Sequence, residues 1–468
     1  MTVIYAASTP SKKGSRTAAA GKWLQRNQRF VRRLQWGVVL TYALLLITPN
    51  LVPLPDHTAH IWNNISLFAR FIFWGIWWPG VLLSMLLFGR LWCGLLCPEG
   101  ALSEWASRNS RGRAIPRWMR WPGWPFTAFL LTTVYGQMIS VYQYPAPALL
   151  ILGGSTVAAM LTGWLYGRNH RVWCRYLCPV SGVFGLLAKL APLHYGVDRT
   201  AWSANPPNNG SAGGVICAPM VPLKTMESSS PCHMCGRCAG FRDAIELRAR
   251  SPGSEVTTIS GKSASRWDSA LIIVGLMGTA VGGFLWSSSP WLVAAKQKLA
   301  VWLIHAGVRW PLEQSLPWYL LTNNPAGNDV LSVLDGVLLI AFIAATTLVM
   351  SVIVGLPLVL STKVLSQGWK WQRFHHLAHG ILPIAACGVI LGLSTQTVSL
   401  LRQDHILLPW IAELRMIALV LASGWSLRLV WQIAGQYQAG IRRILATVSA
   451  AIAILAGCGP WLLLFWFW

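Results

Sequence analysis

Residues 67–98 read LFARFIFWGIWWPGVLLSMLLFGRLWCGLLCP. The first part of this stretch, residues 67–89, holds a single charged side chain, that of Arg70. An apolar run of about 20 residues is long enough to cross the hydrocarbon core of a bilayer as one helix. We therefore predict a membrane-spanning helix over residues 67–89, followed directly by a pair of cysteines, Cys93 and Cys97.

The composition of the whole chain is also typical of a membrane protein. The chain of 468 residues is 54% hydrophobic and only 11% charged, against about 25% charged residues in a typical soluble domain. The chain has 28 tryptophans, and tryptophan is enriched at the two interfaces between a membrane and water. The net charge of +24 comes from Lys and Arg in the short segments between apolar runs, which is typical of cytoplasmic loops. No basic stretch has the interleaved aromatic residues of a nucleic-acid site, so we expect a lipid bilayer and no nucleic acid as partner.

Hydropathy predicts an all-α polytopic membrane protein with about nine spans. The predicted spans are residues 36–54, 67–89, 125–142, 148–167, 269–286, 331–360, 378–400, 409–435 and 444–468. Residues 1–35 form a basic tail without a cleavage site, which places the N-terminus in the cytoplasm. Residues 36–195 then contain two membrane hairpins, and residues 267–468 form a second bundle with an outer segment at about 287–330.

Residues 196–266 differ from the rest, because they are rich in Asn, Ser, Gly and Pro and contain no predicted span. They include the motif Cys232-His-Met-Cys235-Gly-Arg-Cys238. Three thiolates at intervals of three residues let one tight loop wrap a cubane iron–sulfur cluster. Zinc is the alternative, although zinc sites more often use two Cys-x-x-Cys pairs or mixed Cys and His sets. We predict a small irregular, ferredoxin-like iron–sulfur domain in the cytoplasm, where thiols stay reduced.

The fourth ligand of this cluster is not part of the motif. A bacterial ferredoxin run continues to a fourth cysteine that serves the other cluster, but Arg242 and Asp243 stand at those positions here. Its absence favours one [4Fe–4S] cluster in this domain. We predict that Cys217, fifteen residues upstream of Cys232, is the fourth ligand. Cys97, Cys178 and a three-iron cluster are the alternatives, and we expect His233 to lie beside the cluster or in solvent.

The cysteine pair at the end of the 67–89 run occurs twice. Residues 90–98 read RLWCGLLCP and residues 171–179 read RVWCRYLCP, with every shared residue displaced by 81 positions. Each copy closes a predicted hairpin at the same membrane face. The repeat therefore places four cysteines at equivalent depths, where they can meet: Cys93, Cys97, Cys174 and Cys178.

Several kinds of site fit such a cysteine quartet. Cysteines at i and i+4 share a helical face, and the proline after each pair ends or kinks the helix. Four thiolates suit a second iron–sulfur cluster, a copper(I) site or a pair of redox dithiols, and four buried thiols packing as small apolar side chains are the remaining interpretation. Arg90 and Arg171 precede the pairs and would lower the thiol pKa or offset the negative charge of a cluster.

Histidines form a third group of candidates. His375, His376 and His379 open the seventh predicted span, where haem or metal ligation competes with hydrogen bonding at the membrane interface. Four more histidines are predicted on the outer side, where a metal or redox-partner site is a further hypothesis: His57, His60, His305 and His405.

A few other polar residues fall in or near the predicted spans. Asp335, Glu413 and Arg415 are functional candidates unless they lie at the level of the lipid headgroups. Cys387 and Cys458 are solitary in apolar runs, so we predict that they serve in packing.

The stretches WCGLLCPEGAL and WCRYLCPVSG, together with the cysteine-rich loop that follows, resemble the polyferredoxin-type family of membrane iron–sulfur proteins. This family includes the membrane quinol dehydrogenase of periplasmic nitrate reductase, the regulator of nitrous-oxide reductase and the accessory protein of cbb3-type cytochrome oxidase. The resemblance covers about residues 67–250. It implies electron transfer through four-iron clusters on the cytoplasmic side of a bacterial inner membrane, and it extends to the seven cysteines of the two repeats and of the 232–238 motif.

Two departures from that family refine the expectation. Most relatives carry two full ferredoxin runs, whereas this chain has one incomplete run, and it adds about four spans after residue 268. That layout is similar to the ferredoxin-like membrane subunit of bacterial ferrous-iron uptake systems. The resemblance implies an electron-transfer subunit, rather than a stand-alone enzyme, that connects a cytoplasmic cluster to a quinone or to a periplasmic redox or metal-uptake partner. A copper- or iron-handling assembly factor that uses the cysteine quartet is the alternative.

A relay is needed in either case, because a hydrocarbon core of about 30 Å is too thick for one electron hop. A second cofactor near the quartet, a quinone or a histidine-held haem would serve. The sequence supports neither quinone nor haem by a motif of its own.

Overall fold

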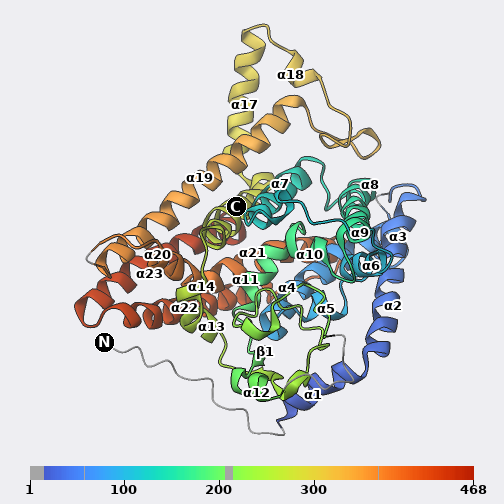
Figure 1. The fold of residues 1–468 in the computed structure, drawn as a ribbon. Coiled ribbons are helices and arrows are strands. Elements are labelled where there is room, and N and C mark those ends of the chain that lie inside the picture. The colour runs from blue at the N-terminus through green and yellow to red at the C-terminus, as the bar shows by residue number, and fades with distance from the viewer. Residues whose placement is uncertain (1–14, 57, 206–213, 367) are drawn as a thin grey trace. The chain divides into compact units, whose positions relative to one another are not determined.

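The computed structural model describes residues 15–56, 58–205, 214–366 and 368–468, drawn as coloured ribbon in Figure 1. These residues form two compact units. The first unit takes residues up to 44, 80–128 and 154–263, and the second takes residues 45–79, 129–153 and 264–468. His57, one of the predicted outer histidines, lies outside the described residues.

The fold is mainly helical, as predicted. Eight helices in the described part of the chain are long and apolar enough to cross a membrane. They are Gln28–Asn50, Ile65–Phe88, Pro145–Tyr166, Arg266–Ser288, Val333–Val364, Leu382–Gln403, Ile411–Tyr437 and Ile441–Phe467. The multi-pass membrane character of the chain is thereby confirmed, and each of the eight overlaps a span predicted from hydropathy.

The remaining predicted span, 125–142, corresponds to helix α7, Trp124–Met138. With 15 residues and a rise of 1.5 Å per residue, α7 is roughly 22 Å long. This is short of the ~30 Å core of a bilayer. The count of nine spans therefore stays a prediction.

The first unit combines membrane helices with a small extramembrane part. Its helices are α1 Arg16–Arg26, α2 Gln28–Ile47, α4 Trp78–Phe88, α5 Leu91–Leu95, α6 Pro98–Ser107, α9 Gly154–Tyr166, α10 Val172–Tyr176, α11 Ser181–Ala188, α12 Arg199–Ala204, α13 Ser254–Thr258 and α14 Ser260–Ser263. Its two strands, β1 Leu193–Val197 and β2 Ile245–Ala249, pair antiparallel, with Leu193 opposite Ala249 and Val197 opposite Ile245. The described part of the basic tail is thus helical: it forms α1 and the start of α2.

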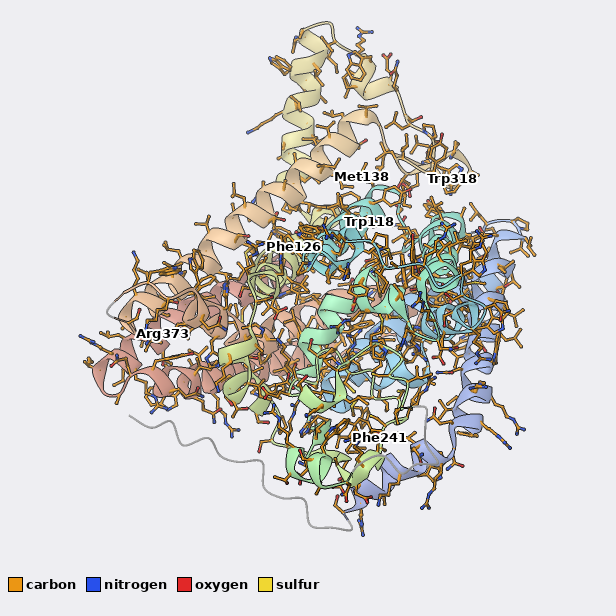
Figure 2. The ribbon with its side chains drawn as sticks, viewed as in Figure 1. Trp118, Phe126, Met138, Phe241, Trp318 and Arg373 are labelled. Carbon is orange, nitrogen blue, oxygen red and sulfur yellow. The ribbon has the colours of Figure 1, made fainter. Side chains whose placement is uncertain are left out.

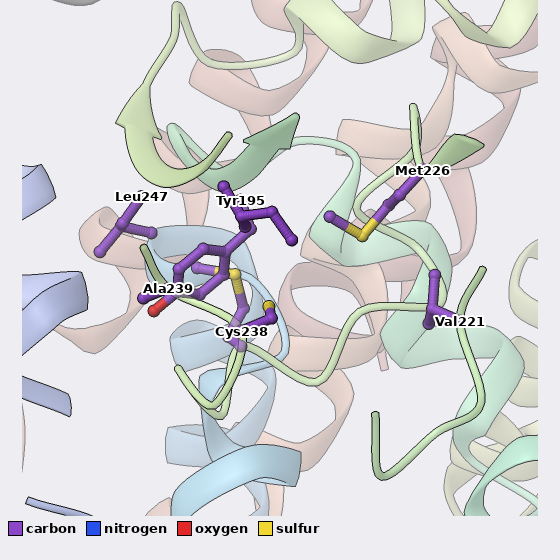
Figure 3. Packing of buried hydrophobic residues seen from close by; sticks show 8 residues of the cluster. Tyr195, Val221, Met226, Cys238, Ala239 and Leu247 are labelled. Carbon is purple, nitrogen blue, oxygen red and sulfur yellow. The ribbon is translucent and has the colours of Figure 1, made fainter. Parts of the chain in front are cut away.

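A small apolar core holds the extramembrane part of this unit together. Tyr195 of β1 and Leu247 of β2 are buried in it with Val221, Met226 and Cys238 (Figure 3). Phe241 and Trp202 pack against this core, with their ring centroids 5.6 Å apart. Phe241 is labelled in Figure 2. The core is too small to be stable without further links, so the loops around it depend on hydrogen bonds and on whatever the cysteines bind.

The second unit is a bundle with an extramembrane hairpin. Its helices are α3 Ile65–Arg70, α8 Pro145–Ala148, α15 Arg266–Ala270, α16 Val281–Leu285, α17 Pro290–His305, α18 Trp310–Glu313, α19 Val333–Val364, α20 Trp371–Gly380, α21 Leu382–Gln403, α22 Ile411–Tyr437 and α23 Ile441–Leu462. Strands β3 Asn323–Asn324 and β4 Asp329–Val330 pair antiparallel. Several of the long helices contain π-helical stretches, at Phe71–Trp77, Leu149–Gly153, Leu271–Ala280 and Leu463–Phe467.

Candidate metal centre

The two copies of the sequence repeat fold alike. Each forms a single helical turn, α5 or α10, that starts after an arginine and contains the first cysteine of its pair. The amide nitrogen of the second cysteine then donates to a tryptophan carbonyl, Cys97 to Trp92 at 2.9 Å and Cys178 to Trp173 at 3.0 Å. The repeat is therefore a repeat of backbone geometry as well as of sequence.

The second cysteine of the first copy also caps a helix. Cys97 is the N-cap of α6, with Pro98 at the first helical position, and its Sγ accepts a hydrogen bond from the amide of Gly100 at 3.4 Å. A thiolate at this place is favoured by the partial positive charge at a helix N-terminus. Burial nevertheless raises the pKa of Cys97, and the hydrogen bond from Gly100 only reduces that rise.

The four repeated cysteines affect one another's ionisation. Burial raises the pKa of the Cys97 thiol, and the charges of Cys174 and Cys93 raise it further. Burial likewise raises the pKa of Cys178, helped by Glu99 and by the other three thiols, and raises that of Cys174 to about 12. Thiols influence one another in this way only at short range, so the structure brings the predicted quartet together.

Two of the four thiols are buried and two, Cys97 and Cys178, are half-buried, and this bears on the redox-dithiol and apolar-packing interpretations. Cys93 and Cys174 are 6% and 7% exposed, whereas dithiol exchange needs an accessible thiolate. Simple apolar packing does not explain the polar groups beside the thiols. The carboxylate of the half-buried Glu99 accepts hydrogen bonds there from the Ser155 hydroxyl and from Trp173 Nε1.

The second group of cysteines lies around the 232–238 loop. Burial raises the pKa of Cys232 to about 12, and the thiols of Cys235 and Cys217 add to the rise. The pKa of Cys238 is raised by burial and then by Cys232, Cys235 and Cys217. Cys217 therefore lies beside the 232–238 loop, and its role as the fourth ligand stays a prediction.

Left-handed backbone shapes this loop. Met234 has φ 54° and Gly236 has φ 77°, which lets the chain curl tightly enough for three cysteines to converge. A side chain at Gly236 would also collide with Leu24 of α1, since a Cβ there would lie 2.6 Å from Leu24 Cβ. In addition, Gln28 Nε2 donates to the carbonyl of Cys235 at 3.1 Å. Helix α1, from the predicted tail, thus covers the loop.

The two sets of cysteines are neighbours, because Gly94 packs directly against the 232–238 loop. A Cβ on Gly94 would lie 2.1 Å from the carbonyl oxygen of His233 and 2.9 Å from the amide nitrogen of Cys235. Arg90 Nη1 also donates to the carbonyl of Ser230 at 2.9 Å. The residue after Cys93 therefore packs against the backbone of His233 and of Cys235.

Cations line this junction. Arg171 donates to Glu104 at 2.9 Å and to the carbonyl of Cys93, and Arg237 pairs with the other oxygen of Glu104 at 2.5 Å. Burial would raise the pKa of Glu104, but Arg171 and Arg237 outweigh it and hold that pKa below its usual range. Glu104 thereby fixes both guanidinium groups in place.

Several donors at the junction have no partner in the protein. Among the described residues, Arg90 Nε, Arg171 Nη2 and both ring nitrogens of His233 are buried without a hydrogen bond. Buried polar groups are normally paired. An iron–sulfur cluster satisfies such donors, because its sulfurs accept hydrogen bonds from nearby N–H groups. Eight thiols and these unpaired donors therefore fit iron–sulfur clusters.

A single-ion site is not formed here. No group of three or more His, Cys, Asp and Glu side chains in the described part of the chain is placed to hold one metal ion.

The other candidates lie in the second unit, where the three clustered histidines have protein partners. His375 Nδ1 contacts Ser269 Oγ at 2.9 Å, His376 Nδ1 contacts the Tyr437 hydroxyl at 2.7 Å, and His379 Nε2 lies 3.5 Å from Asp268. Burial lowers the pKa of His375. These contacts are those of a hydrogen-bonded interface cluster, and they leave haem ligation without support.

The charged residues near the spans also have local roles. Asp335 closes a capping box with Ser332 at the start of α19 and pairs with Lys296. Arg415 donates to Ser394 Oγ at 3.0 Å. Glu413 lies exposed on α22. Cys458 contacts Ser423 Oγ at 3.2 Å, in agreement with a packing role for that cysteine.

Comparison with known proteins points to the two copies of the repeat. The family described as "4Fe-4S binding domain" matches residues 71–122 and 147–197. These two segments carry the two copies of the repeat, and the 232–238 loop lies outside both. The family match therefore supports iron–sulfur binding in the region of the quartet.

One curated relative also matches. It is a protein of Escherichia coli (strain K12) named "Putative electron transport protein YccM", 23% identical over 230 residues. The match takes in 43% of this chain and spans 62% of the relative's length. No solved structure matches the chain.

The fold and the site thus define a class, that of multi-pass membrane proteins with a [4Fe–4S]-binding domain. Within that class, the particular feature of this chain is the pair of adjoining four-cysteine sets in its first unit.

Proposed function

We propose that the chain is a membrane electron-transfer protein in which each set of four cysteines holds one [4Fe–4S] cluster. The first cluster would be held by Cys93, Cys97, Cys174 and Cys178, and the second by Cys217, Cys232, Cys235 and Cys238. The observation that carries the proposal is the contact of Gly94 with the 232–238 loop, because it makes the two donor sets neighbours.

The protein supplies what buried, anionic clusters need. A [4Fe–4S] cluster takes up and gives back single electrons at a potential set by charge, hydrogen bonds and solvent exposure. Arg90, Arg171 and His233 offer buried N–H groups at the junction. Helix α1 and Gln28 cover the 232–238 loop and keep water from it. The chain's own residues thus bind, shield and electrostatically balance the centre.

The direction and partners of electron transfer follow from charge and resemblance. The basic segments beside the repeat favour the cytoplasmic face for both sets, with the N-terminus on the same side of a bacterial inner membrane. From there we propose that electrons pass to a quinone or to a periplasmic redox partner, in a system that supports ferrous-iron uptake. The name of the curated relative, which speaks of electron transport, supports the first part of this proposal.

Iron and sulfide analysis tests the cluster count. Protein purified without oxygen should contain about eight iron and eight sulfide per chain, since a cubane has about four of each. Replacing Cys97 and Cys178 by Ser should leave about four of each, and so should replacing Cys232 and Cys235. Cys387→Ala is the matched control, because Cys387 lies in α21 of the second unit, and it should leave all eight.

Two results would contradict the proposal. Four iron in the native protein and four in the Cys97/Cys178 variant would remove the cluster from the quartet and favour the copper- or iron-handling alternative. No sulfide in any preparation would exclude iron–sulfur chemistry altogether.

A further inference from the structure

A polar cluster in the second unit has no part in the cysteine centre. It joins the loop between the helices Gln28–Asn50 and Ile65–Phe88 to the end of α21, and its members are His60, Asp404 and His405. Apolar packing fixes the two segments together: Ile61 is 2% exposed and packs with Phe71 and Leu400. The cluster is therefore held by the bundle rather than by loose loops.

His60 is oriented by a buried carboxylate. Its Nδ1 lies 3.0 Å from Asp404 Oδ1, and the Asp404 side chain is only 5% exposed. The amide of Ile61 donates to both oxygens of Asp404 at 3.2 Å. An ionised carboxylate can only accept hydrogen bonds, so Nδ1 of His60 is the donor. The lone pair of His60 is then on Nε2, in a side chain that is 49% exposed.

His405 brings a second imidazole to the same place. Its ring centroid lies 6.4 Å from that of His60. His405 follows the end of α21 directly and has φ 62°, the left-handed position where glycine is the usual residue. Two exposed imidazoles thus lie side by side at a point that the chain holds in a fixed conformation.

We propose that His60 and His405 form an open binding site for a transition-metal cation, with Asp404 as the positioning residue. Histidines that bind metals almost always donate their other ring N–H to a carboxylate or carbonyl, which fixes the tautomer and the ring. The pair His60–Asp404 has that arrangement before any metal is present. Imidazole ligands suit zinc, copper, iron and nickel rather than magnesium or calcium.

The site is suited to transient binding. Structural zinc sites are closed by four protein ligands, whereas only two imidazoles meet here, and the described residues contain no complete three-ligand set. The remaining coordination positions are left for water or for the ligands of a protein that delivers or removes the cation. This inference does not depend on the cluster assignment of the cysteines.

Equilibrium dialysis with Zn²⁺ as the probe tests the site. The full chain, with its clusters loaded and in lipid nanodiscs, should bind one Zn²⁺ measurable by mass spectrometry. His60→Gln and His405→Gln should each weaken binding at least tenfold. His305→Gln is the matched control, because His305 is an exposed histidine at the end of α17, and it should leave the affinity unchanged.

Substitutions at Asp404 separate positioning from folding. Asp404→Asn should weaken Zn²⁺ binding by about 10- to 100-fold, the usual effect of losing such a carboxylate, and Asp404→Glu should restore part of it. A purely structural role would make both variants melt earlier without this difference in affinity. Unchanged Zn²⁺ binding in the His60→Gln/His405→Gln double variant would overturn the proposal, as would loss of binding only when cysteines are replaced.

Discussion

Gly94 shows how one missing side chain shapes the centre. A methyl group at this position would overlap the carbonyl oxygen of His233. We predict that Gly94→Ala forces the 232–238 loop away, destabilises the protein by about 1–3 kcal/mol as overpacking usually does, and lowers the iron content. Thermal unfolding and iron analysis of the purified protein measure both effects.

Gly37→Ala is the matched control for this prediction. Gly37 lies in α2, and a Cβ there would meet nothing within 4 Å. Its substitution should leave iron content unchanged and raise helix stability slightly, because Ala is the better helix former. Full iron occupancy in Gly94→Ala would show that the close approach is not needed.

At the level of residues, the sequence revealed the thiols but not their surroundings. The i, i+4 and i, i+3 spacings and the 81-residue repeat select seven cysteines, and Cys217 is added because it lies in the same extramembrane segment. Gly94, Glu104 and Gln28 went unnoticed, because each acts through a partner more than 60 residues away in the chain. The second Arg-x-Trp-Cys of the repeat is the sequence signal that indicates Arg171, which connects Glu104 to the carbonyl of Cys93.

Among the elements, the β1–β2 hairpin depends on a buried ion pair. Glu255 of α13 accepts hydrogen bonds from Ser228 and Ser229 and pairs with Arg250 at 2.5 Å. Burial would raise the pKa of Glu255, but Arg250 and the serines outweigh it and lower that pKa. A carboxyl group with a lowered pKa in the folded state stabilises the fold above its unfolded pKa, and this contribution is lost as pH falls through the folded value.

We therefore predict a pH-dependent effect of Glu255→Gln. At pH 7 the variant should lose about 3 kcal/mol of local stability around residues 228–230, because Arg250 is left buried and unpaired. The difference from the native protein should shrink below about pH 4. Hydrogen exchange of the amides of residues 228–230 measures it.

The neighbouring Glu227 provides the control. Its ion pair with Arg199 is 60% exposed on the Glu227 side, and exposed pairs contribute little. Glu227→Gln should alter exchange by less than about 0.5 kcal/mol at any pH. An equal loss in the two variants would mean that burial of Glu255 is not what stabilises the hairpin.

Helix α1 gives a further prediction at this scale. Gly21 lies against β2, and a Cβ there would be 3.0 Å from Leu247 Cβ. Gly21→Val should lift α1 from the 232–238 loop and let oxygen and water in. We expect cluster absorbance to decay several-fold faster in air, whereas Ala20→Val, on the exposed side of the same helix, should decay as the native protein does.

Hydropathy predicted the long helices because an apolar run of about 20 residues indicates a membrane-spanning helix. It missed α1 and the β1–β2 pair, which are short and polar. These elements are positioned by tertiary contacts of Gly21 and Tyr195. Such contacts produce no periodic pattern of apolar residues in the sequence.

For the whole molecule, contacts within the second unit constrain the number of crossings. His60 and Asp404 touch, so the loops that contain them lie at one membrane face. Five candidate spans separate the two residues, but an odd number would leave them on opposite faces. We infer that α7 crosses as well, which makes six spans between them and nine in total.

Reporter fusions along the full chain test this topology. Reporters at Gly112 and Gly214 should both give a cytoplasmic signal, and reporters at Gly307 and at the C-terminus should give a periplasmic one. If α7 does not cross, the first two reporters will disagree. Such disagreement would also place cysteines of the proposed centre on opposite sides of the membrane. It would therefore contradict both the nine-span topology and the proposed pair of clusters.

The packing of α1 on β2 has a consequence for biosynthesis. Gly21 leaves the ribosome early, yet the strand it contacts at Leu247 is made about 226 residues later. At bacterial translation rates of roughly 5–20 residues per second, that is a delay of about 11 to 45 seconds. During this interval α1 has no strand to pack on, so the helix can cover the 232–238 loop only after both the loop and β2 have been made.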